Sequence, residues 1–569
     1  MAQSSTDAKA GSGPKGDVGS WLRDAAERAN AGRIAEAQAL YEQILRVDPN
    51  HPQALHDAAL LARMRGDQPA AIELMTRAAA AAPQSAELRN SLAVVLGSVG
   101  RCEEALASFD EAIRLNGDYA DAYSNRGVVL ARLGREDEAV AAWERALAIQ
   151  PTHIDARSHL GALCVRSGRP LKGAEHLREA VRLAPNSADA RNNLGTALRE
   201  SGDLDGAIAE YRKAMELSPQ HVDAMTNLGA ATNELGRPRE AVPLFRETIE
   251  LRSDFALAHW NLALSLLSLG EFEPGWREFE WRKQIVAEWA FTRRLPQPQW
   301  NGSSVAGATV LVICEQGLGD TFQFVRYLPL LKERRARVVL ECQPALAPLM
   351  QQVAWIDRVV PRGEPLPPFD IHVHLLSLPG IFGTRIDTIP ARVPYLNADV
   401  SRADRWSAAL SGGGKKIGIA WQGDPRAPAQ RARSIPLSAF APLANVPEVQ
   451  LFSLQKGHGV EQIPARKDRL RLAEFDPPLD QDAAFLDAAA VMKRLDLVIT
   501  SDTSIAHLAG GLGVPVWVAL PKVADWRWMQ ERPDSPWYPT MRLFRQTVPG
   551  AWGEVFDRMA AVVRRGVST

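Results

Sequence analysis

Apolar positions follow two different rhythms along the chain. In the first half they recur at helical spacing, as in Ala139, Trp143 and Ala146, which lie at i, i+4 and i+7 on one helix face. From Gly307 onward, short apolar runs such as 308–314 (ATVLVIC) alternate with helical stretches. The sequence therefore predicts an α-helical region followed by an α/β region built on parallel sheet.

A period of 34 residues organises the helical half. Three positions recur in phase at this spacing: a proline or its substitute, a glycine, and a small residue. The first series is Pro49, Pro83, Gly117, Pro151, Pro185, Pro219 and Ser253; the second runs from Gly32 to Gly270; the third is Ala37, Ala71, Ala105, Ala139, Gly173, Ala207 and Ala241. This is the period of the tetratricopeptide repeat, a helix-turn-helix unit whose copies stack into a superhelix that binds peptides or proteins.

The clearest unit predicts two helices, 119–133 and 137–149. Gly127 is expected where these helices approach closely, Gly134 ends the first helix, and Pro151 stops the second. We expect seven such units over about 18–255, and then a degenerate, tryptophan-rich eighth that caps the array and docks on the next domain.

An asparagine recurs at the sixth position of the first helix in several repeats. Its amide offers both a donor and an acceptor, so a row of them could hold an extended peptide with little sequence preference. Alternatively, these side chains cap or bridge neighbouring repeats. The candidate peptide-binding residues are Asn125, Asn193, Asn227 and Asn261.

The second half predicts two Rossmann-like lobes with a cleft between them, which is the outline of a GT-B glycosyltransferase. We expect strands at 308–314, 338–342, 359–360 and 371–373, and then at 416–421, 449–454, 495–500 and 514–520. The predicted division is a disordered tail (1–17), a tetratricopeptide superhelix (18–289), a linker (290–306), an acceptor-side lobe (307–395) and a nucleotide-sugar-side lobe (396–569). Ligands of such sheets bind beyond the carboxyl ends of the strands.

The turn after the first strand carries Gly317, Gly319 and Asp320. The glycines allow the backbone to approach a ligand closely. Asp320 could act as a general base on an acceptor hydroxyl. The alternative for Asp320 is a structural role as the cap of the following helix.

A second turn, 500–507, joins a buried strand to a helix whose start suits a diphosphate. Thr503 and Ser504 add hydroxyl donors, whereas Asp502 would cap the helix or meet a ribose. His507 lies one turn further on and is either a ligand contact or a core residue.

The third turn carries Arg433, whose guanidinium suits bidentate phosphate recognition but could equally be a solvated loop cation. Gln455 and Lys456 follow another strand and are further donor-site candidates, with Lys456 as a second cation.

These segments resemble the family 9 glycosyltransferases, which include the heptosyltransferases of lipopolysaccharide synthesis. The resemblance rests on GD at 319–320 with Pro329, RSIP at 433–436, and SDTS at 501–504 with His507, Ala509 and Pro515. It implies that Asp320 is the base, that Arg433, in place of the usual lysine, and the 502–507 segment meet the nucleotide diphosphate, and that the reaction is metal-independent and inverting.

The whole chain is similar to bacterial tetratricopeptide-repeat glycosyltransferases, through EQGLGD, RSIPL, LQKG, SDTSIAHLAG and DWRWMQERPDSPWYP. Some members of that group modify flagellin, and the architecture is similar to the eukaryotic O-GlcNAc transferase. Segments 525–528 and 535–538 match no heptosyltransferase counterpart; they form either a wall of the donor or acceptor site or packing aromatics.

Charge and cysteine content narrow the function classes. The formal net charge is −1, so no global field favours nucleic acid. The four cysteines form no CxxC pair, which disfavours zinc and disulfides and suits a cytoplasmic location. The polar first 20 residues contain no apolar core of a signal peptide, and no run of 18 apolar residues predicts a membrane span.

The sequence thus predicts a protein glycosyltransferase. It would move a sugar from a nucleotide-sugar, its co-substrate, to a hydroxyl of a protein held by the repeats, and would need no metal or other cofactor. Alternatives are a scaffold with a degenerate enzyme domain, and an enzyme acting on a surface glycolipid or polysaccharide. A repeat array of this kind could also form homo-oligomers.

Overall fold

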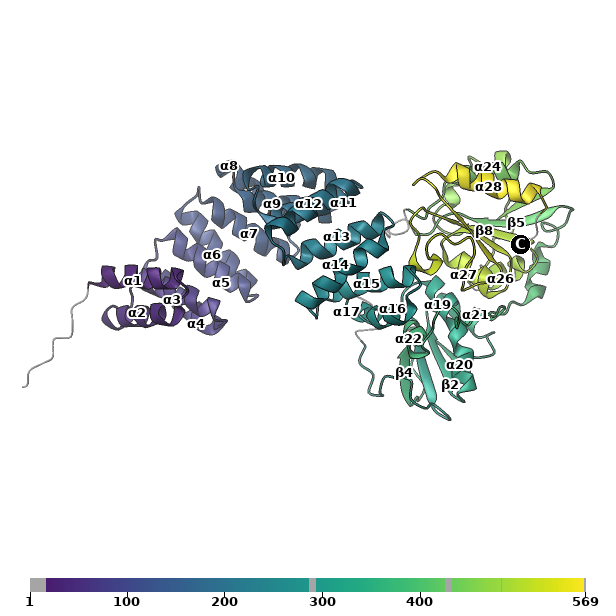
Figure 1. Cartoon of the computed structure of the whole chain (residues 1–569), viewed down its shortest axis with the longest axis horizontal. Helices are drawn as coiled ribbons and strands as arrows, with labels where there is room; N and C mark the ends of the chain where they lie inside the picture. Colours follow the sequence, from purple (N-terminus) through teal and green to yellow (C-terminus); the bar gives the residue numbers. More distant parts are fainter. Residues whose placement is uncertain (1–16, 286–292, 425–431, 482–483, 567–569) are drawn as a thin grey trace, which may run out of the picture. The chain divides into compact units, whose positions relative to one another are not determined.

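The computed structural model describes residues 17–285, 293–424, 432–481 and 484–566 (Figure 1). The chain forms two compact units, one ending at Pro219 and one beginning at Gln220. The predicted tail (1–17) lies outside the described residues except for Asp17, which caps the first helix. The first residues of the predicted linker (290–306) also fall outside them. Among the described residues, no helix has the length and apolar character needed to cross a bilayer.

The first unit contains six helix pairs, which repeat with the predicted 34-residue spacing. Their bounds are α1 (Val18–Asn30), α2 (Ile34–Val47), α3 (Pro52–Met64), α4 (Gln68–Ala81), α5 (Ala86–Ser98), α6 (Cys102–Leu115), α7 (Ala120–Arg132), α8 (Glu136–Ile149), α9 (Ile154–Arg166), α10 (Pro170–Leu183), α11 (Ala188–Glu200) and α12 (Leu204–Leu217).

The recurrent glycines and small residues have clear structural reasons. The turn glycines within the pairs adopt left-handed backbone, with φ from 72° at Gly168 to 91° at Gly202, a region that favours glycine. The recurrent alanines are fully buried between the paired helices. Gly127 lies against the Trp143 ring, because a Cβ at Gly127 would come 2.5 Å from Trp143 Nε1. The prediction of a close helix approach at Gly127 is confirmed.

The second unit begins with the remaining repeat helices. These are α13 (Val222–Glu234), α14 (Pro238–Leu251), α15 (Ala256–Ser268), α16 (Phe272–Phe279) and the short α17 (Arg282–Ile285). Trp276 of α16 packs edge-on against Trp526 and Trp537, with ring centroids 5.4 and 6.4 Å away, and its Nε1 donates to Thr384 O at 3.0 Å. The expected aromatic cap of the array therefore does dock on the region that follows.

That region contains two parallel sheets. The first has the order β3-β2-β1-β4 and the second β10-β9-β8-β5-β6-β7. The strands of the first sheet are β1 (Thr309–Ile313), β2 (Arg337–Cys342), β3 (Arg358–Pro361) and β4 (Ile371–His374). Those of the second are β5 (Lys415–Ala420), β6 (Val449–Ser453), β7 (Leu472–Ala473), β8 (Leu497–Ser501), β9 (Val516–Leu520) and β10 (Met541–Arg545).

Helices cover both sheets and fill the connections between strands. The ones that matter for the site are α19 (Leu318–Phe324), which follows β1, and α27 (Ser504–Gly511), which follows β8. These two helices pack against each other. The sequence predicted every strand except the short β7 and the edge strand β10, and it did not predict α26 (Leu486–Met492).

The strand order reverses once in each sheet, between β1 and β4 in the first and between β5 and β8 in the second. At such a reversal the connections leave in opposite directions, so a crevice opens beyond the carboxyl ends of the strands. The loops after β1, β5 and β8 are the three turns that the sequence singled out.

Candidate functional site

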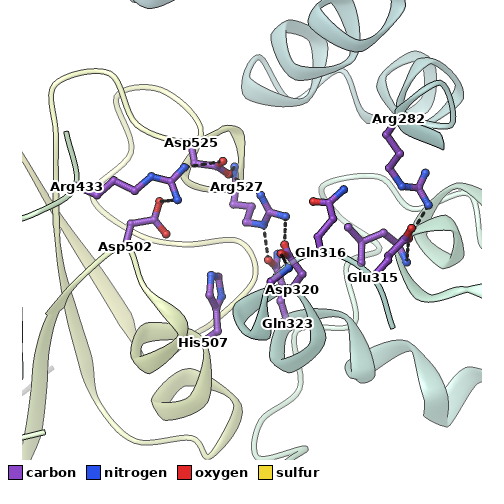
Figure 2. A network of polar contacts seen from close by, with 12 residues as sticks. Arg282, Glu315, Gln316, Asp320, Gln323, Arg433, Asp502, His507, Asp525 and Arg527 are labelled. Carbon is purple, nitrogen blue, oxygen red and sulfur yellow. Dashed lines mark hydrogen bonds and ion pairs between the residues drawn. The ribbon is translucent and has the colours of Figure 1, made fainter. Parts of the chain in front are cut away.

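A cavity of about 450 Å³ lies at these two reversal points. Its walls come from the turn after β1, the loop after β5, the start of α27 and the segment after β9. The structure brings together Gly317, Gly319, Asp320, Arg433, Asp502, Thr503, Ser504 and His507. Figure 2 shows several polar side chains of this cavity together with the neighbouring Arg282, Glu315 and Gln323.

Asp320 occupies the third position of α19 and uses both carboxylate oxygens. Gly317 N donates to Oδ2 at 2.8 Å, which is the helix-capping role, while Arg527 Nη2 pairs with Oδ1. Its side chain remains 17% exposed, toward the cavity. Burial raises the pKa of Asp320, an effect that Arg527 and the Gly317 N–H oppose. The capping role and the cavity-facing position are therefore compatible.

Arg433 lines the cavity, and its guanidinium lies between two carboxylates (Figure 2). Its Nη1 lies 3.1 Å from Asp502 Oδ2, and its Nη2 donates to Asp525 Oδ2 at 3.1 Å. Asp525 in turn accepts from Arg527 Nη1 at 2.9 Å. Charges thus alternate from Asp502 through Arg433, Asp525 and Arg527 to Asp320, three carboxylates and two guanidinium groups in all.

The carboxylates of this network differ in proton affinity. Burial raises the pKa of Asp502, although Arg433 opposes this. Burial also acts to raise the pKa of Asp525, but Arg527 and Arg433 outweigh it and lower the pKa to about 2. Asp525, which lies between two cations, is therefore the most firmly ionised member of the network.

The start of α27 forms another wall of the cavity. Thr503 precedes the helix in extended conformation, and its Oγ1 lies 3.2 Å from Thr500 Oγ1. His507 is buried, stacks on Trp528 at 5.3 Å between ring centroids and shares a 2.9 Å hydrogen bond through Nδ1 with Tyr538 OH. Burial holds the pKa of His507 well below its ordinary value, so its ring is neutral at pH 7. His507 is thus both a core residue and a cavity residue.

Gly319 is the point where α19 meets α27. A Cβ at Gly319 would lie 3.0 Å from His507 Cδ2 and 3.5 Å from Ser504 Cα. Gly317 has ordinary backbone (φ −84°) and caps α19. The Gly319 position therefore serves the close contact between the two helices.

Gln455 and Lys456 lie outside the first cavity and line a neighbouring one of about 370 Å³. Gln455 Oε1 accepts from Trp421 N and Gln422 N at 2.8 and 3.0 Å, so its amide mainly braces two loops. Lys456 Nζ lies 3.3 Å from Asp480 Oδ2, and the lysine side chain is half exposed. The two cavities share Gly423, Asp424, Thr503 and Ser504.

A third hollow, a groove of about 720 Å³, separates α13 and α15 from the segment 522–531. Asn233 and Asn261 line it, and Asn233 Nδ2 donates to Ser265 Oγ at 2.7 Å. Asp525 lines both this groove and the first cavity.

The other candidate asparagines have different surroundings. Asn125 Nδ2 donates to Asn90 Oδ1 of the preceding repeat at 3.2 Å, which is the bridging role. Asn193 is half-buried in α11, and Asn227 lies in α13. Of the four, Asn261 is the one that lines the groove.

Asp525 and Arg527 line the cavity but were not predicted as site residues from the sequence. The sequence identified their segment as a wall of the donor or acceptor site or as packing aromatics, and the structure shows packing aromatics beside residues that line the cavity. Trp526 and Trp528 are buried, whereas the alternate residues Asp525 and Arg527 line the cavity. Two charged residues within the aromatic segment DWRW were the available signal, because charges beside buried aromatic side chains need partners of opposite charge.

Comparison with known proteins defines the first half of the chain. Residues 25–86, 91–154 and 186–254 match models of the tetratricopeptide repeat. The N-terminal helices are tetratricopeptide repeats. This class of repeat suggests a scaffold for protein interaction.

Over 325 residues the chain is 29% identical to Protein FlbA of Caulobacter vibrioides, and this match covers 53% of this chain and 54% of FlbA. The chain thus spans about half the length of this curated relative. Among solved structures, it is similar to YrrB, described as a TPR protein with an unusual peptide-binding site (29% identity, 33% of this chain and 96% of that one, TM-score 0.28). A tetratricopeptide repeat protein from Parabacteroides merdae matches at 15% identity (44% and 98%, TM-score 0.38).

Proposed function

We propose that this protein is a glycosyltransferase that moves a sugar from a nucleotide-sugar to a hydroxyl of a protein acceptor. The observation that carries the proposal is the Asp320 carboxylate, which faces a polar cavity at the strand-order reversals of two parallel sheets, with Arg433 and the start of α27 also on the cavity wall. Paired sheets with such a crevice fit the GT-B arrangement that the family 9 resemblance implies.

The donor would occupy the two neighbouring cavities. The 370 Å³ cavity is lined by apolar side chains suited to a nucleoside, which are Ala420, Leu454, Ala484, Phe485, Ala488 and Ile505. Its junction with the first cavity at Thr503 and Ser504 would hold the diphosphate, since free backbone N–H groups and the positive end of the dipole gather at a helix start. The sugar would then extend toward Asp320.

Arg433 would stabilise the departing diphosphate. In the present structure it is paired with Asp502 and Asp525, so donor binding would exchange at least one carboxylate for phosphate oxygens. Burial raises the pKa of Asp502, whereas Asp525 is held more firmly ionised, so Asp502 is the carboxylate that we expect to be exchanged.

In the transfer step, Asp320 would take the proton of the acceptor hydroxyl as its oxygen attacks the anomeric carbon. A new carbon–oxygen bond forms, the bond between that carbon and the diphosphate oxygen breaks, and the nucleoside diphosphate leaves with the electron pair. The attack inverts the anomeric centre. No protein residue is covalently modified.

The acceptor would enter through the 720 Å³ groove. The groove is bordered by the tetratricopeptide helices α13 and α15 and shares Asp525 with the first cavity. An extended segment bound along Asn233 and Asn261 would thus be directed toward the reaction centre. The presence of repeats beside the cavity favours a protein acceptor over a glycolipid or polysaccharide.

The test is thermal unfolding of the purified protein with UDP, GDP, ADP or CMP and the corresponding nucleotide-sugars. A ligand at 100 times its Kd should add about 2.7 kcal/mol to the free energy of unfolding. One nucleotide should raise the transition in the wild type and in Asp320→Asn but not in Arg433→Ala. Transfer should disappear in Asp320→Asn, and unaltered turnover in that variant would remove Asp320 from the mechanism.

The tetratricopeptide matches favour a second candidate, a scaffold without enzyme activity. Under this alternative, no nucleotide would shift the transition, whereas a protein partner would still co-purify with the chain. Co-expression followed by mass measurement of that partner separates the two functions, since only the enzyme leaves a sugar on it.

A further inference from the structure

Arg527 is held more completely than an ordinary ion-pair partner. Its Nη2 pairs with Asp320, its Nη1 donates to Asp525 Oδ1 at 2.9 Å, and its Nε donates to Gln323 Oε1 at 2.8 Å. The guanidinium also lies 4.4 Å from the centroid of the Trp526 ring. Three hydrogen bonds and an aromatic face fix the plane of the group.

With the guanidinium of Arg527 in place, each oxygen of the Asp320 carboxylate has a hydrogen-bond partner. One oxygen is held from within α19 by Gly317 N, and the other by a side chain that follows β9 in the other sheet. A general base must be both ionised and aimed, and burial by itself favours the neutral acid. A cation at hydrogen-bond distance favours the ionised carboxylate and also fixes its orientation.

We propose that Arg527 is the positioning residue for Asp320, keeping its carboxylate ionised and oriented toward the acceptor hydroxyl. This inference rests on the proposed function. Arg527 acts through Asp320: its side-chain hydrogen bonds go to Asp320, Asp525 and Gln323. Gln323, on the same helix as Asp320, sets the distance between that helix and Arg527.

Other charged groups surround Asp320 and set the background of its titration. They come from the turn after β1, the segment after β9, the loop after β5 and the α27 region. They are Glu315, Asp424, Asp525, Arg527, Arg433, Asp502 and His507. Glu315 is neutralised by Arg282 at 2.7 Å and Asp502 by Arg433, which leaves Arg527 as the cation in direct contact with Asp320.

The segment that carries Arg527 also rests on the tetratricopeptide turns. A Cβ at Gly236 would lie 3.1 Å from Val523, one at Gly270 would lie 2.8 Å from Met529, and Gln530 Nε2 donates to Gly236 O at 3.4 Å. Asp525 and Trp526, the two residues that precede Arg527, line the acceptor groove. The positioning residue is thus connected to the surface where the acceptor would bind.

The experiment compares wild type with Arg527→Met, which removes the cation, and Arg527→Lys, which keeps the charge but loses the planar fork. Arg402→Met is the matched control, since Arg402 forms a partly buried ion pair with Asp487 (2.8 Å) away from the cavity. The probe is the ¹³C carboxyl resonance of Asp320 in the full chain, assigned by its absence in Asp320→Asn and followed over pH.

We expect Asp320 to titrate at a higher pH in Arg527→Met than in wild type, because a lost cation disfavours the ionised form. In Arg527→Lys it should titrate near the wild-type pH, and in Arg402→Met it should not move. An Asp320 titration that is the same in wild type and Arg527→Met would overturn the proposal. If Arg527→Met does not fold, Arg527→Lys decides through its kinetics.

With the donor identified by thermal shift, transfer should fall roughly 100-fold in kcat in both Arg527 variants, with donor KM changed far less. The acid limb of the pH profile should move upward in Arg527→Met alone. Unchanged kcat in Arg527→Lys would contradict the orienting role. A wild type that transfers no sugar would refute the proposed function instead, and the carboxyl titration would still report on the Arg527–Asp320 pair.

Discussion

Arg282 and Glu315 form an ion pair in which neither side chain has any exposed surface. Arg282 Nη2 lies 2.7 Å from Glu315 Oε1 and also donates to Ser377 Oγ at 2.9 Å. Arg282 belongs to α17, after the last repeat, and Glu315 stands directly before the turn that presents Asp320. This pair therefore anchors the turn that carries Asp320 to the end of the tetratricopeptide array.

Arg282→Met should destabilise the second unit by about 3–5 kcal/mol, because it leaves the Glu315 carboxylate buried without its cation. Urea unfolding followed by tryptophan fluorescence measures the loss. The double variant with Glu315→Leu should recover much of it, since both charges are then gone. Arg385→Met, which breaks an exposed pair with Asp387 in the same unit, should change stability little, and an equal effect would contradict the prediction.

Gly127→Ala should destabilise the first unit by about 1–3 kcal/mol. The new methyl group would fall within 2.5 Å of the buried Trp143 ring, whose Nε1 is fixed by a 3.0 Å bond to Ser124 O. Gly117→Ala is the control, because the atom nearest to a Cβ there is Ile113 O at 4.0 Å, an ordinary contact, and its φ is not left-handed. Calorimetry of both variants checks this. Equal unfolding temperatures in Gly127→Ala and Gly117→Ala would contradict the prediction, because they would show that the paired helices move apart without loss of stability.

Asp525 should make the free energy of unfolding fall more steeply as the pH is lowered. Its pKa is about 2 in the folded chain, because the effect of Arg527 and Arg433 outweighs the upward effect of burial, whereas an unfolded aspartate titrates near about 3.9. Its ionised form therefore contributes stability that is fully present above about pH 4 and is lost as the pH falls toward 2. Chemical unfolding of wild type and Asp525→Asn between pH 6 and 3 measures this. The free energies of unfolding of the two proteins should converge at low pH; a difference that stays constant with pH would contradict the lowered pKa of Asp525.

Trp276→Ala should cost about 3–5 kcal/mol, since it empties a buried site packed on Trp526 and Trp537. Trp526 lies between Asp525 and Arg527, so the loss should also loosen the cavity wall and weaken nucleotide binding. Trp276→Phe should retain part of both properties. Thermal shifts with the identified nucleotide measure how nucleotide binding depends on Trp276. If Trp276→Ala is destabilised but binds the nucleotide as the wild type does, the packing of Trp276 and the nucleotide site are independent.

The repeats and most strands could be predicted because their signals are local and periodic. A turn glycine such as Gly134 is required by its own left-handed backbone, and a run such as 308–314 predicts β1 by its apolar character alone. The turns holding Asp320, Arg433 and Asp502 could be predicted as cavity residues because carboxyl ends of parallel strands share one edge.

The pairing inside the cavity could not be predicted in the same way. Arg433 carries two carboxylate partners, and one of them, Asp525, is 92 residues away in sequence. Arg527 and Asp320 are 207 residues apart. The Arg527–Asp320 pair depends on how the two sheets pack, and the Arg433–Asp525 pair on how two distant loops of the second sheet meet; no local pattern encodes either. The strand β10 was missed for a related reason, since an edge strand is defined by its neighbour β9.

The division of the repeats between two compact units bears on how such a chain can evolve. In the first unit each 34-residue repeat contacts mainly its neighbours, so duplication or deletion of a whole repeat would lengthen or shorten the array while leaving its internal contacts intact. The repeats from Gln220 onward have no such freedom, because Gly236, Gly270 and Trp276 are fitted to particular side chains beside the cavity. Natural variation in repeat number should therefore be concentrated before Pro219, and the last two repeats should be inherited together with the sheets.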